Sequence, residues 1–391
     1  MSVTKTERIS WGSNLGSSLK GALVGLAVFV AGFPLLFWNE GNAVRTRKAL
    51  DEGEGACVSV PSNAAVDPAN EGALVHMSGL ADTEEVLRDG EFGVHARAIR
   101  LERSVEMYQW EETSRTSEER NLGGSVTRTT VYDYRRAWSA QAIDSADFNE
   151  AGHDNPAAMP FESVSLTARE VSFGAFRLQP DQIARIGGAR SFAPPADYAC
   201  PVSTNATLAG GFVYLPAGAD GHDPVAAPQV GDVRVRFEVV EPHEISLVYR
   251  QSGDTFVPYT AKNGKTIALL ADGVRDAAGM FASARRASST LCWILRLAGF
   301  LLMYFGLSGV VRPLSAFASV IPFLGRAVGF VASIGAFAVA APCAIATIAV
   351  AWLFYRPVLG VSLLAAAVAL FAWRAYRHKA DAVADTAPAA S

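Results

Sequence analysis

Four apolar runs constrain this chain more than any other feature of its sequence. A helix needs about 20 apolar residues to cross a hydrocarbon core about 30 Å thick. Runs close to this length or longer occur at residues 21–38, 291–311, 327–355 and 358–373. They predict a membrane protein with four transmembrane α-helices and one large water-facing domain, residues 39–290, inserted between the first and second spans.

The charge pattern agrees with this division. Only 18% of the 391 residues are charged, whereas soluble proteins average about 25%. Residues 39–290 carry 35 acidic and 24 basic side chains, a net charge of −11. A domain this acidic argues against nucleic acid as a partner, because phosphate-binding surfaces need an excess of Lys and Arg.

The first run is predicted to be an uncleaved anchor. A cleaved signal peptide is the alternative, but the run is long for one and no small-residue cleavage site follows it. Trp38 stands where an interfacial aromatic residue is expected. We therefore expect residues 21–38 to remain in the mature protein.

Arg296 is the one charge inside the second run. Ionisable residues within spans often have a functional partner. Arg296 lies only five residues after the start of its run, however, so its side chain is expected to extend to the interface. The following segment, 312–326, is bounded by prolines, is too short to cross, and is predicted to be an interfacial connector.

Four spans place both termini on one side of the membrane. Segments 1–20 and 374–391 are expected in the cytoplasm, the latter ending in a disordered tail. The short flanking segments hold eight basic residues on the expected inner side and six on the outer side, a weak bias in favour of this orientation. The large domain is then periplasmic in a bacterium and lumenal in a eukaryote.

Alternation of apolar and polar residues predicts that the large domain is mainly β, with some helix (α+β). Residues 233–239 and 245–249 alternate on either side of Glu241-Pro242-His243 and are expected to pair as a hairpin. Residues 99–107 and 126–138 read as two further strands.

Helical signals in the domain are fewer. Residues 83–88 are consistent with one or two helical turns, and 180–186 begin with Pro at the first helical position. Residues 268–286 are expected to form a helix that leads into the second span.

The four cysteines predict no metal site, because no CxxC or Cys/His ligand spacing is present. Cys57 and Cys200 lie in the large domain and are candidates for a disulfide if that domain faces an oxidising compartment. Free thiols are the alternative, since sequence does not show whether their Cβ atoms approach each other.

No catalytic motif is recognisable. The sequence has no glycine-rich phosphate loop, HExxH or GxSxG, and its six histidines are scattered. We therefore predict no enzymatic activity, no cofactor and no metal. An aromatic group on two expected strands suits either a ligand surface or, more simply, cross-strand packing: Tyr108, Trp110, Tyr132, Tyr134 and Trp138.

Two GxxxG pairs are candidates for close helix packing, because glycine has no Cβ to keep backbones apart. They are Gly21 with Gly25 and Gly325 with Gly329. Chance matches are also expected in a chain with 34 glycines.

Several short motifs, in order along nearly the whole chain, resemble the LUMA (transmembrane protein 43) family. They are Trp38-Asn39-Glu40-Gly41, Asn70-Glu71-Gly72, Glu106-Met107-Tyr108-Gln109-Trp110 and Gly231-Asp232. The resemblance implies a four-span protein of the endoplasmic reticulum and inner nuclear membrane with a lumenal domain. It also implies a role in nuclear-envelope organisation with lamins and emerin, and no established enzymatic activity.

Abundant Ala and Arg with little Lys indicate a GC-rich genome, such as a bacterial one. There the lamin role would not transfer, whereas membrane organisation would. The leading hypothesis is thus a membrane scaffold whose partners are lipids, further copies of itself and other membrane or envelope proteins. The alternatives are a membrane-anchored hydrolase or ligand sensor with a site in the large domain, and a channel, which the nearly uncharged spans disfavour.

Overall fold

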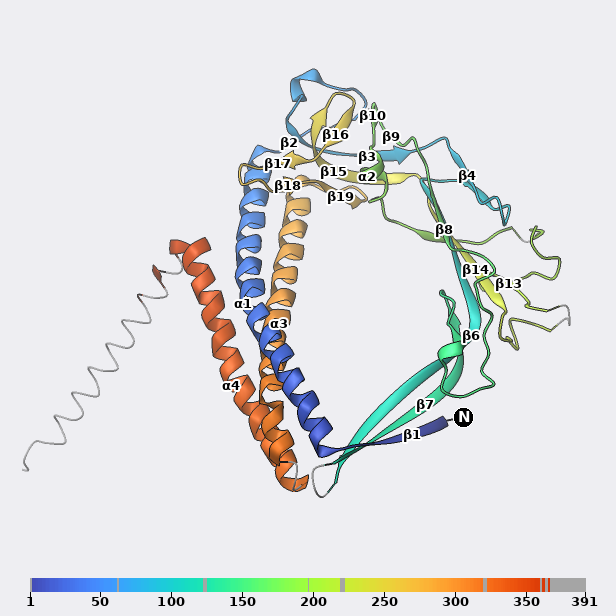
Figure 1. The fold of residues 1–391 in the computed structure, drawn as a ribbon. Coiled ribbons are helices and arrows are strands. Elements are labelled where there is room, and N and C mark those ends of the chain that lie inside the picture. Colours follow the sequence, from blue (N-terminus) through green and yellow to red (C-terminus); the bar gives the residue numbers. More distant parts are fainter. Residues whose placement is uncertain are drawn as a thin grey trace, which may run out of the picture. The chain divides into compact units, whose positions relative to one another are not determined.

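The computed structural model describes residues 2–61, 63–121, 125–195, 197–218, 222–318, 322–358, 361, 362 and 365 (Figure 1). These residues divide into two compact units. The β unit contains Met1–Glu7, Ala49–Glu119 and Thr127–Ala284. The helical unit contains Arg8–Lys48, Arg120–Val126 and Arg285–Ser391.

Three helices in the described part of the chain are long and apolar enough to cross a membrane. They are α1 (Trp11–Ala56), α3 (Ala277–Ala318) and α4 (Pro322–Tyr355). Three of the four predicted spans thus coincide with long helices. The fourth, 358–373, and the tail, 374–391, lie almost entirely outside the described residues.

The long helices extend beyond the apolar runs that predicted them. The 46 residues of α1 give a length of about 69 Å, because Ala, Arg, Lys and Glu after residue 42 continue the helix without adding apolar character. Likewise α3 continues through Pro313 to Ala318. The connector predicted at 312–326 therefore consists largely of the end of α3 and the start of α4.

An eight-stranded sheet forms one layer of the β unit. Its order is β1-β7-β6-β14-β13-β12, with β11 also paired to β14 and β8 to β6. The strands are β1 (Ser2–Ile9), β6 (Arg100–Arg120), β7 (Val126–Ser139), β8 (Val164–Thr167), β11 (Arg190–Phe192), β12 (Thr207–Ala209), β13 (Phe212–Leu215) and β14 (Val233–Val240).

A seven-stranded sheet forms the second layer. Its order is β10-β9-β3-β15-β16, with β19 paired to β15 and β2 to β3. The strands are β2 (Val58–Ser59), β3 (Leu74–Asp82), β9 (Ser172–Phe173), β10 (Phe176–Arg177), β15 (His243–Ser252), β16 (Thr255–Val257) and β19 (Leu269–Asp272).

Smaller elements complete the β unit. Two strand pairs stand apart from the large sheets: β4 (Val86–Arg88) with β5 (His95–Arg97), and β17 (Tyr259–Thr260) with β18 (Thr266–Ile267). The helix α2 (Pro180–Ile183) has Pro at its start, as predicted, and η1 (Pro68–Asn70) and η2 (Ser145–Asp147) are single 3-10 turns.

One hydrophobic core joins the two large sheets. Val105 and Phe237 from the first sheet and Met77 and Tyr249 from the second belong to the same cluster of buried side chains. The burial of β14 alternates strictly from Val233 to Val239. The predicted mainly-β domain is therefore confirmed, and so is the predicted alternation of 233–239, whereas residues 245–249 are all buried.

The predicted hairpin between 233–239 and 245–249 is wrong. In the structure β14 pairs with β6 and β13, whereas β15 pairs with β3, β16 and β19. Pro242 separates the two strands, and the chain passes from one sheet to the other. Alternation specifies which face of a strand is buried, but it does not specify the neighbouring strand.

Three local predictions also need correction. Residues 86–88 form strand β4 instead of a helical turn. Residues 269–272 form strand β19, so the helix expected from residue 268 begins at Ala277. The N-terminal segment, expected to be separate from the domain, contributes β1 to the first sheet; its Thr and Val residues favour a strand, but eight largely polar residues carry no burial signal.

Candidate functional site

A buried ion pair lies inside the helical unit. The side chain of Glu40, on α1, is fully buried and faces Arg296 on α3. Arg296 donates two hydrogen bonds to this carboxylate, from Nε at 2.6 Å and from Nη2 at 2.9 Å. Trp352 on α4 donates a third from Nε1 at 2.8 Å. One carboxylate therefore joins all three long helices.

The neighbours of Glu40 in the Trp38–Gly41 motif also make helix contacts. Asn39 is buried, and its Nδ2 donates to the backbone oxygen of Cys292 at 3.0 Å. A Cβ at Gly41 would meet the ring of Tyr355, so a larger residue would have to displace that ring. Trp38 is 53% exposed, as expected for an aromatic residue at a membrane interface.

Arg296 has a buried partner that its position in the sequence did not predict. Its guanidinium is held by Glu40 and lies over the ring of Trp293, 4.5 Å from the centroid. A buried carboxylate needs such a partner, because an unpaired charge away from water is costly. The position of Arg296 near the start of its run concealed this, since the partner is 256 residues away in sequence.

Glycines allow α1 and α3 to approach closely. A Cβ at Gly25 would lie 2.5 Å from the backbone oxygen of Gly306, and a Cβ at Gly306 would lie 2.5 Å from the backbone nitrogen of Phe29. A Cβ at Gly21 would meet nothing within 4 Å. Of the first predicted pair, Gly25 is thus the packing residue, and its true partner, Gly306, was not predicted.

Gly325 and Gly329 fall in the first turns of α4. The side-chain surroundings of the helix up to residue 327 lie outside the described part of the structure, so the second predicted pair stays a prediction.

Two motifs of the β unit meet where β6 passes β14. The backbone nitrogen of Tyr108 donates to the oxygen of Asp232 at 2.8 Å, and that of Gly231 donates to the oxygen of Tyr108 at 2.9 Å. Gly231 has a φ of +98°, a conformation that favours glycine. The fully buried carboxylate of Asp232 accepts from the backbone nitrogens of Ala217 and Gln229. These residues fix the turn before β14.

The rest of the 106–110 motif organises the loop after β7. Gln109 is fully buried, donates to the oxygen of Gln141 and accepts from the nitrogen of Ile143. The nitrogen of Trp110 donates to Asn155 Oδ1 at 2.7 Å. Met107 is buried in the core. All the contacts of Met107, Gln109 and Trp110 that the described residues show therefore hold strands and loops of the fold in place.

The outward face of the first sheet carries aromatic and charged side chains. The Tyr108 ring lies 5.2 Å from that of Trp138, which lies 5.8 Å from that of Tyr214. The guanidinium of Arg234 lies 4.7 Å from the Trp138 ring and 4.8 Å from the Phe212 ring. We call Tyr108, Trp138, Phe212, Tyr214, Arg234 and Arg236 the aromatic face.

Ion pairs cross the same face. Arg234 pairs with Glu106 on the adjacent strand β6, and Arg236 pairs with Glu238 at 2.9 Å. The predicted cross-strand packing of aromatic rings is confirmed for Tyr108 and Trp138. Tyr132 and Tyr134 lie elsewhere on β7: Lys5 lies over the Tyr132 ring at 5.8 Å, and Tyr134 belongs to a separate cluster.

That cluster surrounds His153. Its ring is stacked on Tyr134, with centroids 4.1 Å apart, and meets Trp110 edge-on at 4.5 Å. The hydroxyl of Tyr134 donates to Glu112. Burial, together with this hydrogen bond, raises the pKa of Tyr134 to about 12. His153 is buried by packing, and the cluster brings no nucleophile beside it.

The remaining predicted residues lie in structural positions. Glu71 accepts from the backbone nitrogen of Gly253, and Gly72, with a φ of +75°, donates to the oxygen of Gln251. Asn70 ends the 3-10 turn η1. The 70–72 motif thus joins the turn before β3 to the end of β15.

The disulfide considered for Cys57 and Cys200 is not formed, and both are free thiols. Cys57 packs beside a small cluster that contains Phe281, whereas Cys200 packs against the main core. Burial raises the pKa of Cys57 to about 11, and the negative charge of Glu54 adds to this effect. A thiol with so high a pKa is a poor nucleophile at neutral pH.

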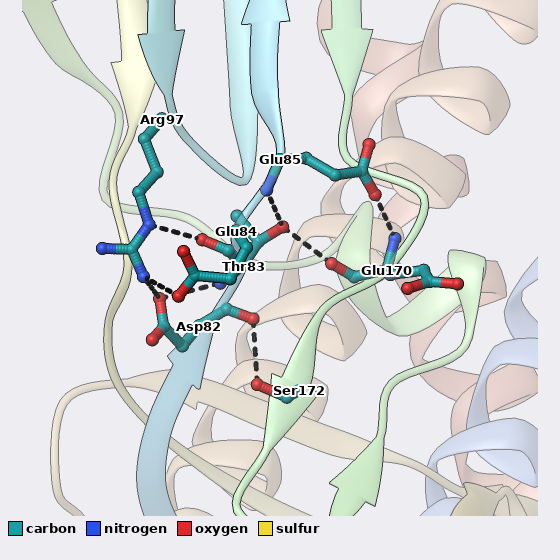
Figure 2. A network of polar contacts seen from close by, with 7 residues as sticks. All are labelled: Asp82, Thr83, Glu84, Glu85, Arg97, Glu170 and Ser172. Atoms are coloured by element: carbon teal, nitrogen blue, oxygen red, sulfur yellow. Dashed lines mark hydrogen bonds and ion pairs between the residues drawn. The ribbon is translucent and has the colours of Figure 1, made fainter.

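A polar network lies at the end of β3 (Figure 2). Arg97 donates to Asp82 and to Glu84, each at 2.8 Å, and to the backbone oxygen of Thr83 at 2.7 Å. The hydroxyl of Thr83 donates to the backbone oxygen of Glu170 at 2.7 Å. Sequence reasoning missed this network, because its residues come from strands and loops that are separate in sequence.

Metal binding has no support in the described part of the chain, where no group of three or more His, Cys, Asp or Glu side chains is placed to hold an ion. His222 and His243 each contact a carboxylate, Asp232 and Asp272 respectively, at turns next to strands.

Comparison with known proteins identifies related sequences. A family model described as transmembrane protein 43 matches residues 107–357. Transmembrane protein 43 of Mus musculus is 36% identical over 368 residues, which cover 91% of this chain and 89% of that protein. The Homo sapiens protein is 36% identical over 373 residues, with the same coverage.

A more distant relative, the transmembrane protein 43 homolog of Drosophila melanogaster, is 31% identical over 363 residues and covers 90% of this chain and 93% of that protein. No solved structure matches the chain significantly.

Proposed function

The chain belongs to the transmembrane protein 43 family, and on this premise we propose that it is a non-enzymatic membrane scaffold that holds copies of itself together at the bilayer. As a member of this family with three long apolar helices, it is an integral multi-pass membrane protein. The scaffold role rests mainly on one observation, the aromatic face of the first sheet.

The composition of the aromatic face supports protein binding. Trp, Tyr and Arg are the residues that contribute most often to binding energy at protein interfaces. All six members of this face are partly exposed. Their rings are held by tilted and edge-on contacts with one another and by Arg234, so little side-chain entropy is lost when a partner binds.

The charges of this face favour a second copy as the partner. Acidic and basic side chains alternate across it, with Glu106 beside Arg234 and Arg236 beside Glu238. A two-fold symmetric contact places the same surface on both sides, so a pattern of both signs can complement itself. A partner with a strong net charge of either sign would meet no surface of opposite net charge there.

The helical unit supplies the anchor for such a scaffold. Glu40 connects three helices through hydrogen bonds to Arg296 and Trp352, and Gly25 and Gly306 bring two of them into close contact. Such a bundle holds its shape in lipid, where helix association depends on packing and interhelical hydrogen bonds. We further propose that the acidic large domain faces the periplasm or lumen.

Charge reversal tests self-association. Arg236→Glu places like charges in the proposed contact and should weaken association by about tenfold or more. The exchange Arg236→Glu with Glu238→Arg restores the mixed pattern and should restore association. Light scattering of the full chain in lipid nanodiscs and cross-linking in native membranes measure the effect.

Arg115→Glu is the matched control, because the side chain of Arg115 is 87% exposed on β6 and lies outside the aromatic face. A wild-type chain that stays monomeric over a hundredfold range of concentration would refute the proposal. So would an equal effect of Arg115→Glu and Arg236→Glu.

The hydrolase alternative gains no support from the described residues, since Cys57 has a raised pKa and His153 is enclosed by aromatic rings. Ligand sensing is the second candidate, and a cleft beside the polar network of Figure 2 favours it.

A further inference from the structure

A cleft of about 470 Å³ opens on the β unit beside the end of β3. Ligand pockets in proteins typically measure about 300–1,000 Å³, so this cleft is large enough for a small molecule. Its walls come from four segments that are distant in sequence: the end of β3, the segment before β9, the link from β10 to α2, and the turn before β16. It lies apart from the aromatic face.

One wall is held rigid by the network around Arg97. This guanidinium already binds Asp82 and Glu84, so the charges of those two carboxylates are largely satisfied. The hydroxyl of Ser172 donates to the backbone oxygen of Asp82 at 3.2 Å and ties the second segment to β3 (Figure 2).

The opposite wall has its own ion pair. Arg177 donates to Asp254 through Nε at 3.0 Å and Nη2 at 2.7 Å. The side-chain hydrogen bond and charge of Arg177 lower the pKa of Asp254. Both residues line the cleft, and each charge already has a partner.

Two charged side chains that line the cleft remain unused. Among the described residues, neither the guanidinium of Arg169 nor the carboxylate of Glu170 forms a hydrogen bond or an ion pair. Their backbone is nevertheless fixed, because both nitrogens donate to one oxygen of Glu85, at 2.8 Å and 2.6 Å. A cation and an anion without a hydrogen-bonded partner among the described residues are thus carried by adjacent residues of a held segment, with Arg177 as a more distant charge near Glu170.

We propose that this cleft binds a small zwitterion, with Arg169 holding its carboxylate or phosphate and Glu170 holding its ammonium group. A planar guanidinium suits an oxyanion, since it can donate two parallel hydrogen bonds. The other carboxylates of the walls already contact a guanidinium, since Asp82 and Glu84 share Arg97 and Asp254 has Arg177. A ligand with one charge of each sign would pair the two remaining side chains. A free amino acid and a phosphoethanolamine headgroup share this chemistry.

Calorimetry on the full chain in nanodiscs made of anionic lipid tests the proposal. L-Alanine and glycerophosphoethanolamine serve as zwitterionic probes, and acetate and ethylammonium serve as probes with one charge each. We expect at least one zwitterion to bind about tenfold more tightly than either singly charged probe. The tighter of the two zwitterions identifies the source of the ligand.

Two variants locate the site. Arg169→Gln and Glu170→Gln should each weaken zwitterion binding by about tenfold, whereas Arg115→Gln should leave it unchanged. Both cleft residues are exposed, so neither change should disturb folding, which circular dichroism checks. Absence of binding by both zwitterions, or binding that neither variant weakens, would overturn the proposal.

This inference goes beyond the proposed scaffold role and can fail independently of it. The cleft variants should leave self-association unchanged, and Arg236→Glu should leave zwitterion binding unchanged.

Discussion

Replacing Arg296 with glutamine would leave the Glu40 carboxylate buried without its cation. The guanidinium supplies the two charged hydrogen bonds that this carboxylate accepts, and only the bond from Trp352 and a long one from the Cys292 thiol, at 4.0 Å, would remain. Because Glu40 is fully buried, water cannot replace the lost donors. Breaking a buried pair by removing one partner costs about 3–5 kcal/mol.

We therefore expect Arg296→Gln to reduce the free energy of unfolding by about 3 kcal/mol, or roughly a hundredfold in the folding equilibrium. Retaining Trp352 places the expected value at the lower end of the range. Reversible unfolding in mixed micelles, followed by tryptophan fluorescence, measures this difference.

The double variant Glu40→Gln with Arg296→Gln distinguishes the loss of the ion pair itself from the cost of leaving Glu40 buried without a cation. Two amides can hydrogen-bond to each other without a buried charge, so the double variant should be more stable than Arg296→Gln alone. A loss below about 1 kcal/mol for Arg296→Gln, the size expected for an exposed pair, would refute the reasoning. It would show that Arg296 reaches water.

Three further predictions test other contacts. Gly25→Ala should destabilise the helical unit by about 1–3 kcal/mol, because its Cβ meets backbone atoms, whereas Gly21→Ala should be neutral in the same unfolding assay. Lys5→Cys with Asn149→Cys should be joined by a short thiol-specific cross-linker, because Lys5 Nζ lies 2.6 Å from Asn149 Oδ1; failure would place β1 away from the large domain, as the sequence-based orientation requires. Burial raises the pKa of Tyr134 to about 12. The stability contributed by the protonated Tyr134 side chain should therefore persist below about pH 10, the usual phenol pKa, and disappear as pH rises through 12. If an ultraviolet titration of Tyr134→Phe still shows every phenol that ionises late in the wild type, this prediction is contradicted.

Local properties of the chain determined its helices and its buried strand faces. Length and lack of charge predicted the long apolar helices α1, α3 and α4, because lipid compatibility depends on consecutive residues. Alternation from Val233 to Val239 predicted which side chains of β14 are buried, since successive residues of a strand point to opposite faces. The motifs of the family also lie in order along the sequence.

Only the tertiary structure decided which distant residues are partners. Strands β14 and β15 are adjacent in sequence, yet each pairs within a different sheet, because a strand's neighbour depends on the whole layer. The charged cleft likewise needs four separate segments. Glu40 and Arg296 are visible in the sequence as charges near span ends, but folding alone brings them to 2.6 Å. The burial of Glu40 then makes that contact necessary, because a carboxylate without water requires a cation beside it.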